Sequence, residues 1–243
     1  MEIRLTFIAL LCLSAVALAQ RPGWNFDGGF RGRFQGKVVT NEPYSGVGTT
    51  TSKKTLSDGN TIDESSCVKV FRDSSGRARR EETRNSATCS ATPNSIFISD
   101  PVAGVEYAID TRKNTYRQFT IKIPGAGTTP PATTRPANPN QVETSLGTEA
   151  IPGTSLSAQG TKTVTTIPAG QFGNAQPITI TSIRWYSPDL QIVIQSSLTD
   201  PRNGATSYQL SNVSTAEPAE SLFQLPAGLT LQQGANMRGR RAQ

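Results

Sequence analysis

The chain carries a serine and a lysine at the spacing of a known nucleophile motif. The run Ser66-Cys67-Val68-Lys69 fits S-x-x-K, in which penicillin-binding enzymes use the serine as the nucleophile. That chemistry needs both side chains one turn apart on a helix, whereas this run is typical of a β-strand. No S-D-N or K-T-G partner motif follows it. We therefore predict no catalytic residue here.

The sequence contains no histidine. Histidine is the commonest general base and metal ligand, and it titrates near neutral pH. Its absence excludes Ser-His-Asp and Cys-His catalysis and makes zinc and copper sites improbable. We predict a non-enzymatic protein without a cofactor. A hydrolase that uses carboxylates is the remaining enzymatic alternative, because acids distant in sequence can meet in a fold.

Four oxygen-bearing residues lie close together in sequence and could gather around Ca²⁺. They are Asp58, Asn60, Asp63 and Glu64. Their spacing lacks the pattern of an EF-hand loop. We interpret them as a turn followed by a solvated strand start, and we predict no metal site.

A dense charged run from Arg77 to Glu82 is a further candidate site. In a strand, alternation places Arg77, Arg79 and Glu81 on one face and Arg80 and Glu82 on the other. A solvated edge or cross-strand ion pairs would explain such a run. Anion recognition is the alternative.

Aromatic side chains supply the last candidate site. Most strand aromatics belong to a core, but some could line a groove for a ligand. The candidate groove residues are Trp185, Tyr186, Tyr107, Phe119 and Tyr208.

Residues 1–19 have the pattern of a secretory signal peptide. They contain one arginine, an apolar run from Leu5 to Leu18 and a small-x-small site, so cleavage is expected between Ala19 and Gln20. The apolar run is short for a membrane-spanning helix, and no second one follows. We expect an exported protein, periplasmic or extracellular, with no transmembrane segment after signal removal.

Two cysteines, Cys67 and Cys89, remain after signal removal. An even count in an oxidising compartment predicts one disulfide. If residues 73–76 form a turn, Cys67 pairs with Glu82 across the hairpin and Cys89 lies past the strand end. A bridge then needs the 88–94 loop to fold back, and two unpaired thiols are the alternative.

Composition divides the mature chain into segments. Residues 20–36 predict a flexible lead rich in Gly, Arg and aromatic residues, and residues 37–231 a β domain. A Pro/Thr-rich loop interrupts the domain at 124–141, and residues 232–243 form a basic tail. The formal charge of +6 belongs to residues 20–37 and to the tail, since 16 basic and 16 acidic residues balance between positions 38 and 234.

The lead has the composition of Gly/Arg segments that bind nucleic acid through stacked rings. Export argues against that partner, so we predict no nucleic acid. Contact with anionic lipid headgroups or a polysaccharide, or no partner at all, are the alternatives.

Turn signals separate short runs of alternating Thr, Val and Ser throughout the domain. Asp100–Gly104 and Asp200–Gly204 share a D-P-x-x-G pattern, in which Asp accepts backbone N–H bonds and Gly takes the left-handed position. Pro218–Leu222 is the best candidate for a helical turn. Strands are expected at 37–40, 44–56, 61–72, 77–87, 95–99, 105–109, 115–123, 142–150, 154–167, 176–187, 190–199 and 205–214, with short pieces near 222–231.

The C-terminal half carries a pattern that resembles a known family. A Trp strand ends in an S-P-D-L turn at Trp185–Leu190, a hairpin ends at Leu210–Val213, and a closing segment with F-Q-L-P-A-G-L lies at Ser221–Leu229. In the first half, the runs VKVFRDSSGRARREE and SIFISDPVAGVEYAID resemble the early strands of the same family. The chain is similar to exported bacterial proteins related to the periplasmic lipoprotein-sorting carriers (LolA-like), over roughly residues 37–231.

The resemblance implies an all-β fold: a single strongly curved antiparallel sheet, or half-barrel, with little helix and flexible tails at both ends. In the family, the concave apolar face holds an acyl chain or another hydrophobic ligand beneath covering helices. Since this chain has few helical signals, its half-barrel must fill the concavity with side chains, bind a partner or shield the face with loops. Pro168–Ala175 and the 124–141 loop are the candidate shields.

The function implied is that of an exported, non-enzymatic envelope protein. It would bind a lipid-like ligand or an envelope partner in the half-barrel. The alternative is a structural or interaction protein with a filled core and no small ligand.

Overall fold

The computed structural model describes residues 38–121 and 138–232. Several predictions from the sequence lie outside this part of the chain. They are the signal peptide with its cleavage site at Ala19 and Gln20, the 20–36 lead, most of the 124–141 loop and nearly all of the 232–243 tail.

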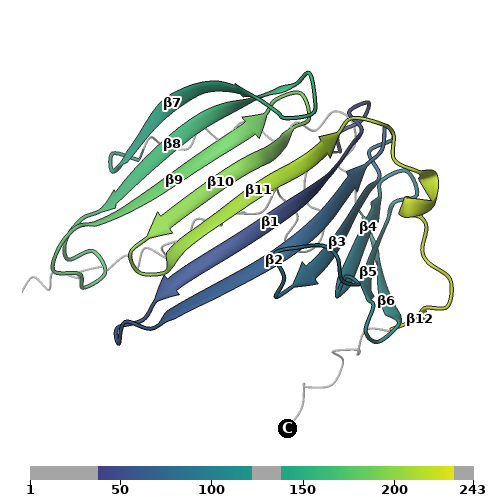
Figure 1. Ribbon diagram of the computed structural model, residues 1–243, viewed down its shortest axis with the longest axis horizontal. Coiled ribbons are helices and arrows are strands. Elements are labelled where there is room, and N and C mark those ends of the chain that lie inside the picture. Colours follow the sequence, from purple (N-terminus) through teal and green to yellow (C-terminus); the bar gives the residue numbers. More distant parts are fainter. Residues whose placement is uncertain (1–37, 122–137, 233–243) are drawn as a thin grey trace, which may run out of the picture.

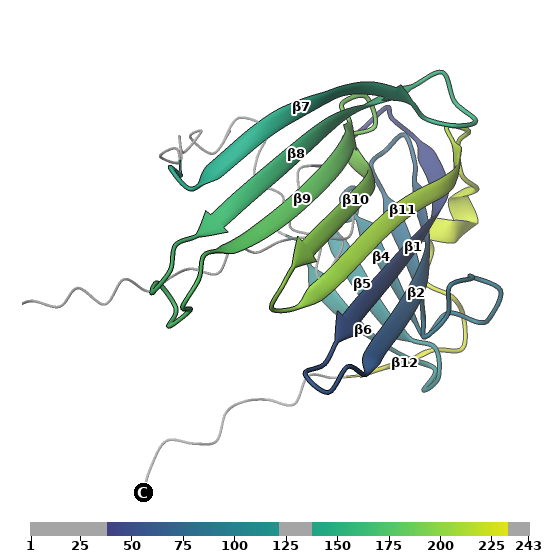
Figure 2. The ribbon, with the colours of Figure 1, turned by 60° about the vertical axis from the view of Figure 1, so that its left-hand side comes forward.

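The described residues form one continuous sheet of twelve strands (Figure 1). Its spatial order is β12-β6-β5-β4-β3-β2-β1-β11-β10-β9-β8-β7. Every pairing is antiparallel except that of β12 with β6. Figure 2 shows the sheet curling so that β4 to β6 lie behind the central strands. The predicted all-β half-barrel with little helix is confirmed.

The strand boundaries follow the predicted ones closely, except that residues 38–40 are not in a strand. The strands are β1 Tyr44–Thr55, β2 Thr61–Arg72, β3 Ala78–Arg84, β4 Ser95–Asp100, β5 Val105–Asp110, β6 Thr115–Thr120, β7 Gln141–Ala150, β8 Ser157–Ile167, β9 Ile178–Ser187, β10 Ile192–Asp200, β11 Gly204–Ser214 and β12 Thr230–Leu231.

One pairing between distant parts of the sequence joins the two halves of the sheet. Strands β1 to β6 form one run of hairpins and β7 to β11 another, and β1 pairs with β11 between them. The β1–β2 pairing extends from Tyr44 opposite Arg72 to Thr55 opposite Thr61, so every residue of both strands takes part. The long β1–β2 hairpin is therefore the central rib of the sheet.

The two D-P-x-x-G segments form the turns that the sequence predicts. Asp100 accepts a hydrogen bond from the Ala103 N–H at 2.8 Å. Asp200 accepts a hydrogen bond from the Arg202 N–H at 2.9 Å. The closing residues Gly104 and Gly204 have φ values of 69° and 90°, a region that favours glycine. Local side-chain chemistry thus fixes both hairpins.

The β2–β3 turn differs from the prediction by one residue. Arg72 pairs with Ala78, and Cys67 therefore lies opposite Thr83, not Glu82. The turn includes Arg77 because Asp73 and Arg77 close it: the Asp73 N–H donates to the Arg77 carbonyl at 3.0 Å, and the Arg77 N–H donates to the Asp73 carboxylate at 2.8 Å.

Cys67 and Cys89 form the predicted disulfide. The loop after β3 folds back, because the Asn94 N–H donates to the Glu82 carbonyl at 2.6 Å and the Asn94 side chain accepts from the Arg84 N–H at 2.7 Å. These bonds return the loop beside β2. The alternative of two unpaired thiols is wrong.

Two apolar clusters pack on opposite faces of the sheet. The larger combines residues from β1, β2, β8, β10 and β11 with Ile151 and Leu190 from two turns. The smaller lies on the other face of β4 and β5, where Ile96, Ile98 and Ile109 pack with Leu225 and Leu229 of the C-terminal segment.

The C-terminal segment crosses the outer face of β3 to β6 as a strap (Figure 1). It contains a 3-10 turn at Glu220–Phe223, close to the predicted helical turn at Pro218–Leu222, and ends in β12. Arg79 donates to the Leu222 carbonyl at 2.9 Å, and the Ser74 N–H donates to Glu217 at 3.0 Å. In the described part of the chain, no helix is long and apolar enough to span a bilayer.

Removing the disulfide should destabilise the fold without changing its architecture. Because Cys67 and Cys89 are 22 residues apart, the loop-entropy estimate is about 3 kcal/mol. We expect the variant with Cys67→Ala and Cys89→Ala to lose this free energy of unfolding in urea titrations. Wild-type protein in reductant should match it, and the variant itself should not respond to reductant. Equal stability of wild type and variant would contradict the prediction.

Asp200 should make stability depend on acid pH. Hydrogen bonds from the Arg202 side chain, at 2.9 and 2.7 Å, hold the pKa of Asp200 below its ordinary value of 3.8. The stabilisation is complete above the unfolded-state pKa and is lost as pH falls through the lower folded-state pKa. We expect Asp200→Asn to cost about 1–2 kcal/mol at pH 7 and much less near pH 2. The exposed Asp63→Asn is the control, and a pH-independent loss in Asp200→Asn would count against this assignment.

Candidate functional site

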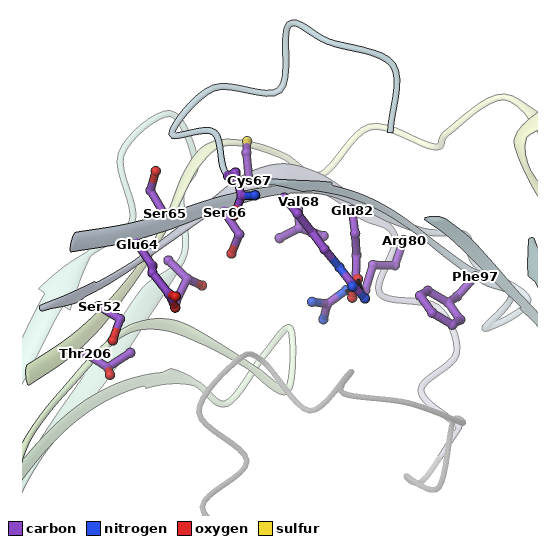
Figure 3. A pocket seen from close by; sticks show the side chains of 13 residues that line it. Ser52, Glu64, Ser65, Ser66, Cys67, Val68, Arg80, Glu82, Phe97 and Thr206 are labelled. Carbon is purple, nitrogen blue, oxygen red and sulfur yellow. Dashed lines mark ion pairs between the residues drawn. The ribbon is translucent and has the colours of Figure 1, made fainter. Parts of the chain in front are cut away.

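The concave face of the sheet is the candidate site. We define it as the face that carries Thr50, Ser66, Val68 and Tyr208, which the pairings of β1 with β2 and β11 place side by side. Strand residues alternate between faces. Figure 3 accordingly shows Ser66 and Val68 on the hollow side of the sheet, with the Cys67 sulfur on the other side.

A cavity of about 670 Å³ opens on this concave face. Binding pockets for small molecules span about 300–1,000 Å³. Strands β1, β2, β3, β4 and β11 and the loop after β3 supply its walls. The lining residues are Thr50, Ser52, Glu64, Ser65, Ser66, Cys67, Val68, Arg80, Glu82, Arg84, Asn85, Phe97 and Thr206.

Charged residues of β3 form an ion-pair group at the cavity. The Arg80 Nε lies 3.0 Å from the Glu82 carboxylate, and the Arg84 guanidinium lies 3.8 Å from its other oxygen. Arg79 and Glu81 pair at 2.8 Å on the opposite face. The predicted alternation of the charged run is confirmed. These three ion pairs join neighbours along β3, whereas Arg77 pairs with Asp73 in the turn and with Glu220 of the C-terminal segment.

Hydroxyl groups line the open end of the cavity in two rows. In the outer row, Ser52 lies between Thr206 on β11 and Glu64 on β2. In the next row, Thr50 lies opposite Tyr208 and Ser66. Neighbouring strands are about 4.8 Å apart, so these rows present hydrogen-bonding groups at regular intervals.

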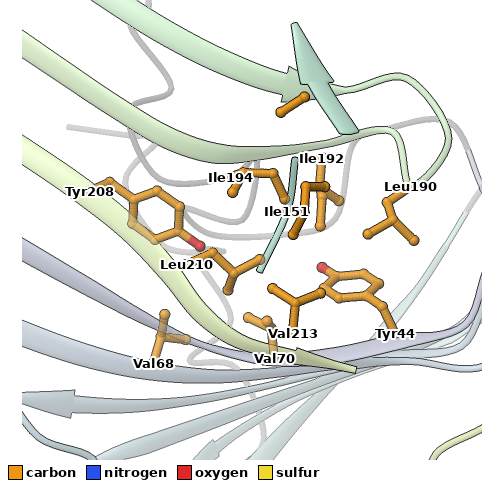
Figure 4. Packing of buried hydrophobic residues seen from close by; sticks show 11 residues of the cluster. Tyr44, Val68, Val70, Ile151, Leu190, Ile192, Ile194, Tyr208, Leu210 and Val213 are labelled. Atoms are coloured by element: carbon orange, nitrogen blue, oxygen red, sulfur yellow. The ribbon is translucent and has the colours of Figure 1, made fainter. Parts of the chain in front are cut away.

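The other end of the concave face, which we call the core end, is filled with apolar side chains. Figure 4 shows Tyr44, Tyr208, Leu210 and Val213 pointing toward one another, with Ile151 entering from the β7–β8 turn. Tyr44, Tyr208 and Ile151 are 3%, 5% and 1% exposed, and burial raises the pKa of Tyr44. The apolar part of the face is therefore a packed core and not an open channel.

Gly48 permits the packing of Tyr208 over the central rib. A side-chain carbon at Gly48 would lie 2.7 Å from the Tyr208 ring and 2.8 Å from Val68. Such distances are too short for any side chain. The Tyr208 ring therefore occupies the space above Gly48, at the boundary between core end and cavity.

A buried guanidinium closes the core end. Arg72 is 6% exposed, and it donates to the Glu42 carbonyl at 2.9 and 2.7 Å and to the Leu190 carbonyl at 2.7 Å. It also stacks 4.7 Å from the centre of the Tyr44 ring. Burial lowers the pKa of Arg72, partly offset by Tyr44, Glu42 and Tyr186. One side chain thus ties the start of β1 to the β9–β10 turn.

The five predicted groove residues do not share one surface. Tyr208 and Trp185 pack in the larger apolar cluster on the concave face, whereas Tyr107 packs in the smaller cluster on the other face. By strand register, Phe119 on β6 shares the concave face with Phe97 on β4. Tyr186 follows Trp185 in β9 and lies under the Arg184 guanidinium. Tyr208 belongs to the packed core. The Trp185 ring lies against Gly160, and Tyr107 packs edge-on against Tyr116, with ring centres 6.0 Å apart. Their role in a ligand groove stays a prediction.

The remaining sequence motifs lie in ordinary strand and turn positions. Ser66 and Lys69 are both in β2, where alternation places them on opposite faces. Asp58 accepts the Asn60 N–H at 2.9 Å in the β1–β2 turn. No group of three His, Cys, Asp or Glu residues that could hold a metal ion occurs among the described residues. The Pro168–Ala175 loop is exposed, and Phe172 at its tip is 60% exposed.

Sequence reasoning missed the hydroxyl rows and Phe97 as site residues. Thr50 and Ser52 are two residues apart, and so are Glu64 and Ser66. This spacing predicts that the two polar side chains of each pair lie on the same face of their strand. Nothing local indicates that Thr206 lies beside them, because β1 and β11 meet only through the closure of the sheet.

No family model matches the chain, and no curated protein matches it. Solved structures match it at the level of the fold. The MucA/MucB complex of Pseudomonas aeruginosa has a TM-score of 0.42 and 12% identity, over 80% of this chain and 59% of that one. The chain thus spans less than two thirds of the MucB chain.

Structures related to lipoprotein sorting are also among the matches. A LolA superfamily protein from Nitrosomonas europaea has a TM-score of 0.32 and 6% identity, over 77% of this chain and 92% of that one. A putative outer membrane lipoprotein-sorting protein domain from Vibrio parahaemolyticus has a TM-score of 0.29 and 7% identity, over 75% and 89%. Both identities are below 10%, and neither TM-score reaches 0.5.

Replacing Arg72 should weaken the core end. Arg72→Met keeps the length of the side chain but leaves the Glu42 and Leu190 carbonyls without their donor, so we expect a loss of about 2–4 kcal/mol in the free energy of unfolding. Lys69→Met, on the opposite face of the same strand, should change stability by about 0.5 kcal/mol or less. Chemical denaturation of both variants measures the difference. Similar values for the two would show that the Arg72 contacts contribute little.

Proposed function

We propose that this chain is an exported, non-enzymatic binding protein of the cell envelope that receives its ligand or partner on the concave face. The observation that carries the proposal is the cavity of about 670 Å³ between the hydroxyl rows and the ion pairs of β3. A void of this size, lined by side chains from five strands, is suited to binding more than to packing.

The arrangement of charges supports binding over catalysis. A general acid or base needs a carboxyl group whose pKa is matched to proton transfer. Glu82 has one oxygen 3.0 Å from Arg80 and the other 3.8 Å from Arg84, so both oxygens are already engaged in ion pairs. The cavity can accept and donate hydrogen bonds, but it lacks an evident proton-transfer pair.

The chemistry of the cavity bears on the lipid-like ligand implied by the resemblance. An acyl chain gains free energy by burying apolar surface, and covering unpaired polar groups costs free energy. Here the apolar residues fill the core end, and most groups that face the open cavity are polar. A ligand of mixed or polar character fits this cavity better than a simple acyl chain.

The second candidate function is that of an interaction protein with no small ligand. The packed core end favours it, since Tyr44 and Tyr208 occupy space that a carrier would leave open. In that case the concave face would contact a protein segment, and purified protein would carry no small molecule.

A matched pair of variants should separate these functions. Thr206 faces the cavity from β11, whereas the preceding Ala205 is exposed on the opposite face. We expect native mass spectrometry of detergent-free, exported protein to show a bound mass that Ala205→Trp retains and Thr206→Trp loses. Retention in both variants would place the ligand elsewhere. A wild-type protein without added mass would favour the interaction protein.

A further inference from the structure

We propose that the concave cavity binds a neutral, polyhydroxylated ligand, such as a segment of an uncharged glycan. The inference rests on the proposed binding function and names the chemical class of the ligand. Four features of the cavity carry it: its balanced charge, its rows of hydroxyl groups, its aromatic inner wall and its shape.

The charges at the cavity cancel. Two acids, Glu64 and Glu82, and two arginines, Arg80 and Arg84, line it. Glu82 lies between the two arginines, at 3.0 and 3.8 Å. An anionic ligand would have to displace Glu82 and approach Glu64, and a cationic ligand would meet two guanidinium groups. A neutral ligand avoids both of these unfavourable charge interactions.

The hydrogen-bonding groups suit a ligand that is itself rich in hydroxyls. Thr206, Ser52 and Glu64 form one row across three strands, and Thr50 and Ser66 continue the next. A hydroxyl both donates and accepts, a carboxylate only accepts, and a guanidinium only donates. A sugar, whose adjacent hydroxyls do both, can satisfy every group in this set, whereas an acyl chain would leave them unpaired at a cost of about 1–3 kcal/mol each.

The inner wall offers an apolar surface beside the charges. Phe97 lies opposite Arg80 in the pairing of β3 with β4, and Figure 3 shows its ring at the end of the cavity nearest Arg80 and Glu82. Val68 adds a small apolar floor. Sugars present C–H faces as well as hydroxyl edges, so one aromatic ring at the end of a polar trough matches both surfaces of a sugar ring.

The hollow extends along the direction of β1 and β2, and its polar groups lie at the end away from the packed core. The Ser52 and Glu64 row lies toward the β1–β2 turn, away from the packed core end. A chain of sugar units could therefore enter from the open end and stop at Phe97 and the core. This shape favours a linear oligosaccharide over a compact solute.

The experiment compares defined probes on the full mature protein. Chitotetraose and cellotetraose are the neutral probes, tetragalacturonate is the anionic glycan, and palmitate is the lipid. Binding is followed by amide chemical shifts in NMR titrations at millimolar probe. We expect a neutral probe to shift the amides around Ser52, Ser66 and Phe97, and tetragalacturonate to bind at least tenfold more weakly.

Two variants locate the binding. Glu64→Gln retains the shape of the side chain but replaces one acceptor oxygen with a donor, so it should weaken the neutral probe about tenfold. Thr206→Trp should abolish the shifts, and Ala205→Trp should leave them unchanged. Thermal unfolding of each variant shows that the fold is retained.

The outcomes test the glycan proposal and the proposed binding function separately. If palmitate or tetragalacturonate shifts the cavity amides and no neutral oligosaccharide does, the glycan proposal is overturned while the binding function stands. If no probe shifts the cavity amides and the exported protein also carries no added mass, both the glycan proposal and the proposed binding function are contradicted. Shifts from a neutral probe that survive Thr206→Trp would place the glycan outside the cavity and also overturn the proposal.

Discussion

A single buried guanidinium sets the geometry on which the rest of this fold depends. In the described part of the chain, no second sheet or helix covers the concave side, so the ends of the sheet must be held by side chains. Arg72 does this by donating to the carbonyls of Glu42 and Leu190, one before β1 and one in the β9–β10 turn. Its planar fork reaches both acceptors at once, which a lysine could not do. The apolar cluster then packs behind it, and the opposite end of the face remains hollow.

The sheet buries different faces in its two halves. Around β1, β2, β10 and β11 the concave face is packed, and on β4 and β5 the other face is packed beneath the C-terminal strap. The concave side of β3 and β4 is therefore free of the core and can be polar. This explains why Arg80 and Glu82 lie at a cavity while Ile96 and Ile98, on the adjacent strand, are buried. The strap thus has an indirect role in the site, since it lets one face of β3 and β4 serve as a core and the other as a wall.

The sequence predicts most turns and strand alternations, which depend on neighbouring residues. It predicts few of the features that depend on pairing between distant strands. The D-P-x-x-G turns, the alternation of the charged run and the 3-10 turn near Pro218 follow from short-range rules, and the structure has all three. The β2–β3 register differs by one residue because the Asp73 carboxylate captures the Arg77 N–H, a competition that spacing alone does not reveal. The face on which each aromatic side chain lies is harder to predict from the sequence. Trp185 and Tyr186 are adjacent, so only one can face the hollow, and which one does so depends on pairings with strands far along the chain. The pairing of β1 with β11 places Thr206 beside Ser52 at the cavity, and no local pattern encodes that pairing.

The disulfide makes the shape of the candidate site depend on redox conditions. Cys67 lies in β2 between Ser66 and Val68, and its partner Cys89 holds the loop that brings Asn85 to the cavity rim. Disulfides persist in oxidising compartments, so under reducing conditions the loop that carries Asn85 would lack this covalent link to β2. Without the bond, the loop would be held beside the sheet by the Asn94 hydrogen bonds to Glu82 and Arg84. The geometry of the cavity rim thus depends on the redox conditions around the protein.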